Sequence, residues 1–171
     1  MFENITSQIT GFVQAHQGWA PFIVGVLAFC ESLAIVSFFV PATVILVAIG
    51  GLIGATGLPF WPMWAAAALG AILGDVLSYV VGRVFKDRVR GSSLLARHKA
   101  TTDRAFDFMH RWGALGVFVG RFSGPLRAFV PLVAGLVAMP QLRFQAANIS
   151  SALLWAAMVL SPGTLLGRWL H

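Results

Sequence analysis

Two apolar stretches of this sequence are long enough to cross a bilayer as helices. Residues 60–82 carry one charge, Asp75, and residues 144–167 carry none. At about 1.5 Å per residue each stretch reaches about 35 Å, which exceeds the roughly 30 Å hydrocarbon core. The pattern therefore predicts two transmembrane helices, bounded at residues 59–84 and 143–169.

Two further apolar stretches are interrupted by residues that break helices. Prolines and glycines punctuate residues 21–58 and residues 112–140, among them Pro41, Gly124 and Pro125. The apolar run after Pro41 reaches about 24 Å, which is too short to cross the membrane. Irregular backbone is tolerated at that depth where it is buried in protein or lines a cavity. We therefore expect two re-entrant hairpins, each entering and leaving the membrane by one face.

The remaining segments are amphipathic or strongly basic. In residues 1–20, apolar side chains recur at spacings of three and four, which predicts an amphipathic helix on a membrane face. Eight of the twelve lysines and arginines fall in residues 83–111, and such clusters mark cytoplasmic loops. We expect residues 85–111 to form this loop, with an interfacial helix capped by Thr101 or Thr102.

The two halves of the chain share one order of elements, a hairpin followed by a long span. The tripeptide Phe-Val-Pro at residues 39–41 recurs at residues 129–131, and at the same offset Glu31 aligns with Arg121. Because a hairpin does not cross the membrane and a span does, the second half must be inverted relative to the first. Inverted repeats with broken segments at matching positions are typical of transporters. The predicted fold is one all-α integral membrane domain over residues 1–171.

Composition supports a membrane protein and excludes several other classes. The hydrophobic fraction is 58% and the charged fraction 11%, whereas soluble domains have about 45–50% and about 25%. The net charge of +6 comes from twelve lysines and arginines against six acidic residues. Because most of the basic residues lie in one cluster, a cytoplasmic loop explains them better than nucleic-acid binding does. The four histidines and the single cysteine show no metal-ligand spacing, so we expect no metal site and no cofactor.

Arg121 and Arg127 stand six residues apart inside an apolar stretch. An arginine at the bilayer centre costs at least about 2.5–3.5 kcal/mol, so these residues need partners, water or a function. Arginine provides a permanent charge and a fork of donors that suits phosphate. We expect the pair, with Glu31 and the hairpin residues Gly124 and Pro125, to bind a phosphate-headed substrate.

Glu31 and Asp75 are the acidic residues of these apolar stretches. Glu31 is expected to neutralise the arginines in the empty site and to protonate or move away when substrate arrives. Asp75 has two interpretations, a coupling residue or a structural acceptor that pairs with Arg83 or with an arginine of the other half. Asn148 is expected to form an interhelical hydrogen bond or a substrate contact. The supporting positions are Ser78, Tyr79, Arg83, Pro41, Thr43, Pro131 and Asn148.

The most specific motif is Gly-Arg-Phe-Ser-Gly-Pro-Leu-Arg at residues 120–127. It is accompanied by Glu-Ser-Leu-Ala-Ile-Val at residues 31–36, Phe-Val-Pro-Ala-Thr at residues 39–43, Gly-Asp at residues 74–75, and by Tyr79, Asn148 and Trp155. Together these motifs resemble the DedA family, also called the SNARE-associated or VTT-domain family, and its YabI-like branch in particular. The resemblance covers about residues 20–167.

The resemblance implies a multi-pass protein of the bacterial inner membrane that returns undecaprenyl phosphate to the cytoplasmic leaflet. By the same resemblance Glu31 is the essential glutamate, and Arg121 with Arg127 is the essential arginine pair. Thr43 stands where many members carry a second acid. The function predicted from the sequence is therefore a lipid flippase, whose partners are the lipid substrate and the bilayer.

Several alternatives stay open at this point. The chain could be a proton- or small-ion-coupled carrier that uses Glu31 and Asp75, or a non-specific phospholipid scramblase. The ion pairs could also be purely structural and pin the hairpins together. We do not expect an enzyme, because no constellation of nucleophile, base and metal ligands occurs. The sequence leaves open the lipid identity, the direction of transport, the energy source, a homo-oligomeric state and the presence of a further C-terminal helix.

Overall fold

Helices form the regular elements in the part of the chain that the computed structural model describes. The described residues are 18–33, 46–47, 49–51, 53–54, 59–85, 99–123 and 127–169. Their helices are α2 (Ala20–Ser32), α4 (Phe60–Val84), α7 (Lys99–Gly120), α8 (Phe129–Leu136) and α9 (Gln141–Trp169). Among these residues no strand occurs, as expected for an all-α class. The amphipathic helix predicted for residues 1–20 lies almost entirely outside the described residues.

Within the described chain, α4 and α9 are the helices that are long and apolar enough to cross a membrane. Both were predicted, although α9 begins at Gln141 rather than at residue 143. The carbonyl of Pro140 accepts a hydrogen bond from the amide of Phe144 (3.1 Å), which starts the helix there. The outward faces of both helices carry large exposed apolar side chains, as contact with lipid requires: Leu69, Leu73, Leu77, Ile149, Leu154 and Met158.

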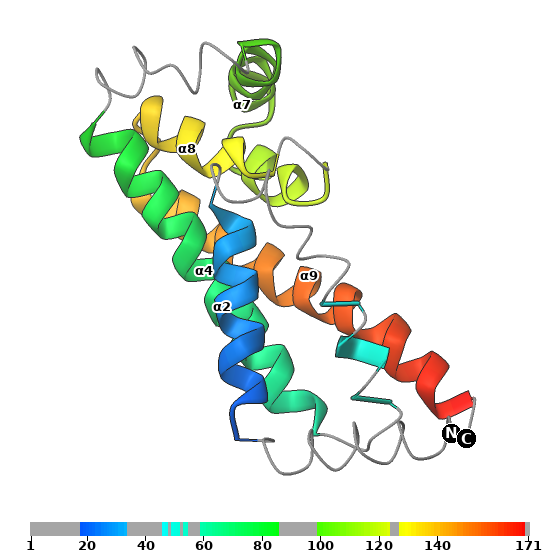
Figure 1. Cartoon of the computed structure of the whole chain (residues 1–171). Coiled ribbons are helices and arrows are strands. Elements are labelled where there is room, and N and C mark those ends of the chain that lie inside the picture. The colour runs from blue at the N-terminus through cyan, green and yellow to red at the C-terminus, as the bar shows by residue number, and fades with distance from the viewer. Residues whose placement is uncertain are drawn as a thin grey trace.

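The two long helices pack against each other in antiparallel directions. The Trp64 side chain donates a hydrogen bond from Nε1 to the carbonyl of Leu153 (3.1 Å). Eight residues further along α4, the carbonyl of Ile72 accepts one from Nδ2 of Asn148 (3.3 Å), which lies earlier in α9. Figure 1 shows α2 lying along α4 and α8 lying near the C-terminal end of α4, while α7 packs against α8 and α9.

Glycines bring α2 and α8 into backbone contact with α4. A Cβ atom added at Gly70 of α4 would lie 2.0 Å from the carbonyl oxygen of Gly25 in α2. One added at Gly135 of α8 would lie 2.1 Å from the carbonyl oxygen of Tyr79 in α4. Small residues of this kind allow close helix packing where no hydrophobic force acts between helices. These contacts fix the two short helices on the long one.

Helix α8 is short and fully buried. Its eight residues reach about 12 Å, far less than the thickness of a bilayer, and all of them are buried. Pro131 is the third residue of the helix, where a backbone amide has no partner within the helix in any case, so this proline does not interrupt α8. The segment therefore combines high apolarity with a length that cannot cross the membrane.

Helix α7 consists of two helical pieces joined at Gly113. Gly113 has φ 52° and ψ −125°, which is outside the helical region and suits glycine. The first piece lies in the predicted interfacial segment and begins at Lys99. The prediction that Thr101 or Thr102 caps this helix is therefore wrong, because both residues lie inside it. The second piece ends at Gly120 and lies within residues 112–140, the segment predicted as the second hairpin.

The described part of residues 46–54 is helical and packs on α9. Leu46 and Ile53 are buried in one cluster with Leu160 of α9. A Cβ atom added at Gly50 would lie 2.7 Å from the carbonyl oxygen of Leu160. The first predicted hairpin thus contacts both long helices, through α2 on α4 and through residues 46–54 on α9. Its connection, with Pro41 and Thr43, lies outside the described residues.

Replacing Ala138 by glycine is expected to stabilise the protein. Ala138 has φ 53°, a left-handed conformation that costs a non-glycine residue about 1–2 kcal/mol. It lies two residues after the end of α8, in the turn where the amide of Met139 donates to the carbonyl of Ala134 (3.0 Å). Glycine removes this strain, although its greater freedom in the unfolded chain offsets about 0.4–1 kcal/mol. Thermal melting of the purified protein should show a rise of a few degrees.

The matched control for this variant is Ala134→Gly in the same helix. Ala134 has an ordinary helical conformation, so glycine there should cost about 1 kcal/mol and lower the melting temperature. A fall in melting temperature for Ala138→Gly would mean that the left-handed conformation of Ala138 does not destabilise the protein.

Candidate functional site

Four charged side chains from four segments meet inside the helical packing. Asp75 of α4 forms an ion pair with Arg121, the residue that follows α7. Glu31 of α2 forms an ion pair with Arg127, two residues before α8. The acids come from the first half of the chain and the arginines from the second half. The two ion pairs therefore join the halves.

All four side chains are withdrawn from the surface, but to different degrees. The side chains of Arg121 and Asp75 are 7% and 8% exposed. The side chain of Glu31 is 3% exposed and that of Arg127 is 19% exposed. With both carboxylates ionised the cluster is neutral, which is how buried charges are tolerated in proteins.

Neutral groups of α9 surround the guanidinium of Arg121. Its Nε donates to Oγ of Ser151 (3.0 Å) and its Nη2 donates to Oδ1 of Asn148 (2.7 Å), in addition to Asp75. The Ser151 hydroxyl in turn donates to the carbonyl of Asn148 (3.1 Å), and the Asn148 amide donates to the carbonyl of Ile72. The position of Arg121 is thus fixed by α4 and α9 together.

Arg127 has a different environment from Arg121. Its Nη2 donates to Oε1 of Glu31, and its guanidinium carbon lies 5.8 Å from the centre of the Trp155 ring. A cation at this distance from an indole face is attracted by the ring quadrupole. Asn148, Ser151 and Trp155 are spaced by three and four residues, so they share one face of α9. That face contacts both arginines.

Tyr79 and Arg83 lie outside the charge cluster and join the end of α4 to the connection between α8 and α9. The Tyr79 hydroxyl donates to the carbonyl of Met139 (2.6 Å), and its ring stacks on Phe144 with centroids 4.2 Å apart. Arg83 donates from Nη1 to the same carbonyl (3.1 Å) and to the Tyr79 hydroxyl. Of the two partners considered for Asp75, the structure therefore selects an arginine of the other half and not Arg83.

The structure brings together five of the side chains that the sequence singled out: Glu31, Asp75, Arg121, Arg127 and Asn148. Ser78 lies next to them, and its hydroxyl donates to the carbonyl of Ser32 (3.4 Å). Gly124 and Pro125 lie outside the described residues, as do Pro41 and Thr43. A substrate-binding role for any of these residues stays a prediction.

Ser151 and Trp155 are contacts of the arginines that sequence reasoning did not place in the site. Both fall on the helical face that begins at Asn148, at positions three and seven residues later. That spacing is visible in the sequence and could have identified them. What the sequence does not contain is the information that this face of α9 points at the arginines.

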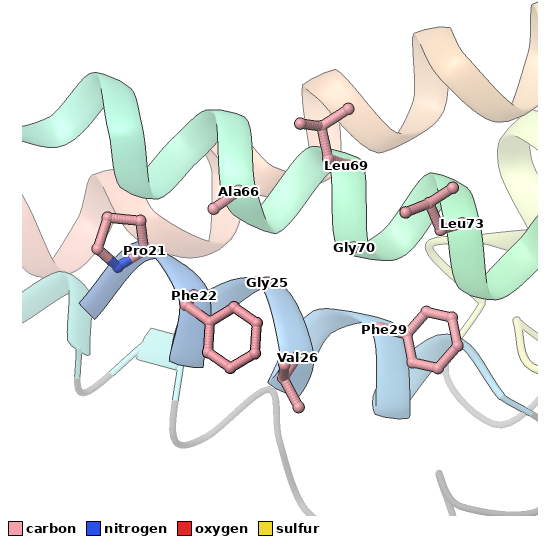
Figure 2. A pocket seen from close by; sticks show the side chains of 9 residues that line it. All are labelled: Pro21, Phe22, Gly25, Val26, Phe29, Ala66, Leu69, Gly70 and Leu73. Atoms are coloured by element: carbon pink, nitrogen blue, oxygen red, sulfur yellow. The ribbon is translucent and has the colours of Figure 1, made fainter. Parts of the chain in front are cut away.

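A separate groove lies on the surface between α2 and α4, as Figure 2 shows. Its volume is about 360 Å³. It is lined by apolar residues and glycines: Pro21, Phe22, Gly25, Val26, Phe29, Ala66, Leu69, Gly70 and Leu73. No side chain in this lining can donate a hydrogen bond, so the groove suits hydrocarbon and not a charged head group.

Comparison with known proteins gives consistent matches to membrane proteins. The VTT domain matches residues 40–165. Inner membrane protein YabI of Escherichia coli is 36% identical over 156 residues, which cover 91% of this chain and 61% of YabI. A membrane protein of Buchnera aphidicola from Schizaphis graminum is 32% identical, with 94% of this chain and 64% of the relative covered. Protein DedA of Escherichia coli is 27% identical, and the match covers 96% of this chain and 76% of DedA.

The chain spans about three fifths of the length of YabI and of the Buchnera protein. Two of these three relatives are named as membrane proteins, and none of the three names states an enzymatic activity. No solved structure matches the chain significantly.

Proposed function

The chain belongs to the VTT-domain (DedA) family of membrane proteins, and from this premise we propose that it moves a phosphate-headed lipid across the bacterial inner membrane. Undecaprenyl phosphate is the substrate that we expect. The observation that carries the proposal is the pair of buried arginines, each held by a carboxylate from the other half of the chain. Such charges are costly in a membrane and are normally retained for a function.

The chemistry of the cluster suits an anionic head group. A guanidinium matches the oxygens of a phosphate as well as those of a carboxylate, because both accept two parallel hydrogen bonds. The empty cluster is neutral, so an arriving phosphate adds at least one negative charge. Glu31, which is 3% exposed, must then take up a proton or move. Substrate binding therefore competes with an internal ion pair, and this competition can couple the head group to a change of conformation.

The arrangement of the short helices supports two opposed re-entrant hairpins. Helix α8 is too short to cross and packs on α4, the long helix of the other half. Residues 46–54 show the corresponding arrangement, because they pack on α9 of the other half. The antiparallel packing of α4 and α9 agrees with an inverted repeat, whose site lies between the two halves. We place residues 85–111 on the cytoplasmic side.

Reconstitution into liposomes tests the proposed function. Fluorescent polyprenyl phosphate should cross the bilayer of proteoliposomes much faster than that of empty liposomes, as measured by quenching of the outer leaflet. The matched controls are the neutral polyprenol with the same tail and labelled phosphatidylcholine, which should both remain slow. Equal acceleration of phosphatidylcholine would replace the proposal with a non-specific scramblase. Proton flux without lipid movement would replace it with an ion carrier.

A further inference from the structure

The two arginines differ in the kinds of groups that contact the guanidinium. The contacts of Arg121 with Asp75, Asn148 and Ser151 are hydrogen bonds that engage Nε and Nη2. They occupy the edge of the guanidinium, which is the part that binds an anion. A phosphate could bind this edge only by displacing acceptors that are themselves held by α4 and α9.

Trp155 contacts Arg127 in another way. The guanidinium carbon lies over the indole ring, 5.8 Å from its centroid. Such a cation–π contact uses no hydrogen-bond acceptor, so the N–H edge of the guanidinium stays directed to anionic partners. Glu31 is the carboxylate at this edge. Trp155 is itself buried, at 6% exposure, so the surface against which Arg127 lies is fixed. A phosphate can replace the carboxylate without disturbing this surface.

The exposed fractions of the two arginine side chains also favour Arg127 as the residue that binds the head group. The side chain of Arg127 is 19% exposed, whereas that of Arg121 is 7% exposed. An entering head group therefore meets Arg127 first. The two arginines are close enough for their charges to interact, so Arg121 adds to the positive potential at Arg127 without direct contact to the ligand.

We infer that the two arginines have separate roles: Arg127, backed by Trp155, binds the lipid phosphate, whereas Arg121, fixed by Asp75, Asn148 and Ser151, anchors the end of α7 to α4 and α9. This inference rests on the proposed function, because it names the residue at which the phosphate is bound. It also adds Trp155 to the substrate site and assigns Ser151 to the structural anchor.

Equilibrium binding and thermal melting of the same variants test this division. The probe is a fluorescent polyprenyl phosphate in nanodiscs, with the neutral polyprenol as the reference for tail binding. Arg127→Lys should weaken binding of the phosphate at least tenfold because the fork of donors is lost, with a small change in melting temperature. Trp155→Leu should also weaken binding, and Trp155→Phe, which keeps an aromatic face, should recover part of the affinity.

Arg121→Lys should give the opposite pattern. We expect a melting temperature lower by several degrees, because the hydrogen bonds to Ser151 and Asn148 are lost, and a loss of phosphate affinity in the folded fraction that is clearly smaller than that of Arg127→Lys. Ser151→Ala removes one hydrogen bond of the same anchor and should show a smaller shift of the same kind, so that the test stands if Arg121→Lys does not fold. Arg104→Lys, an exposed position on α7, is the control that should change neither quantity.

The outcomes separate this inference from the proposed function. If wild type binds the phosphate and the polyprenol equally, the proposed function fails and the inference fails with it. If wild type prefers the phosphate and Arg121→Lys or Ser151→Ala loses as much affinity as Arg127→Lys, the proposed function stands and the division of roles is overturned. Affinity loss at Arg127 and Trp155, with stability loss at Arg121 and Ser151, supports both.

Discussion

An Asp75→Asn variant is expected to lose about 3–5 kcal/mol of stability, which is the cost of leaving one member of a buried ion pair unmatched. The Arg121 guanidinium would remain at 7% exposure against the neutral groups of Asn148 and Ser151. An amide has nearly the same shape as the carboxylate, so the change removes charge without creating a cavity. Stability should therefore fall through electrostatics and not through packing.

The measurement is thermal melting of the purified variant, with Asp103→Asn as the control. Asp103 is exposed on α7, and surface carboxylates contribute about 0–1 kcal/mol, so its melting curve should match wild type. The double variant Asp75→Asn with Arg121→Gln removes both charges and should recover much of the loss. An Asp75→Asn protein as stable as wild type would show that this ion pair does not hold α7 against α4.

A Glu31→Gln variant is expected to bind the phosphate-headed lipid at least tenfold more tightly and to lose transport. The glutamine side chain imitates protonated Glu31, so a carboxylate no longer competes with the phosphate for Arg127. A tenfold gain corresponds to about 1.4 kcal/mol, a modest share of what a buried ion pair can contribute. The site should hold its substrate and fail to release it, because the ion pair that replaces the phosphate cannot re-form.

Binding in nanodiscs and transport in liposomes would be measured on the same preparation of this variant. Glu31→Asp, which keeps the charge on a shorter side chain, serves as the control and should retain measurable transport. Glu31→Gln should still insert and purify, because the Arg127 side chain is 19% exposed and reaches water more easily than Arg121. Wild-type turnover in Glu31→Gln would remove Glu31 from the mechanism.

The sequence predicted the parts of the fold that depend on length and composition. Two uncharged or nearly uncharged stretches form α4 and α9, because a helix satisfies the backbone hydrogen bonds of an apolar span within the span itself. The cost of charge in hydrocarbon likewise singled out Glu31, Asp75, Arg121 and Arg127 before any contact was known. The structure then showed that each arginine has its own acid.

The sequence could not predict which partner each charge has. Whether Asp75 meets Arg83 or Arg121 depends on how α4, α7 and α9 are rotated and aligned, and contacts such as those of Trp64 with Leu153 and of Asn148 with Ile72 fix this alignment between α4 and α9. For the same reason Ser151 and Trp155 could be seen as a helical stripe but not as contacts of the arginines.

The separation of acids and arginines between the two halves has a consequence for how the protein is made. The N-terminal half leaves the ribosome first and brings two carboxylates into the bilayer without any cation to match them, and the C-terminal half brings the cations afterwards. With its carboxylates ionised, the N-terminal half is not electrically neutral in hydrocarbon by itself, and neither is the C-terminal half with its arginines. We therefore expect the early segments to reach their final position only after the late ones arrive.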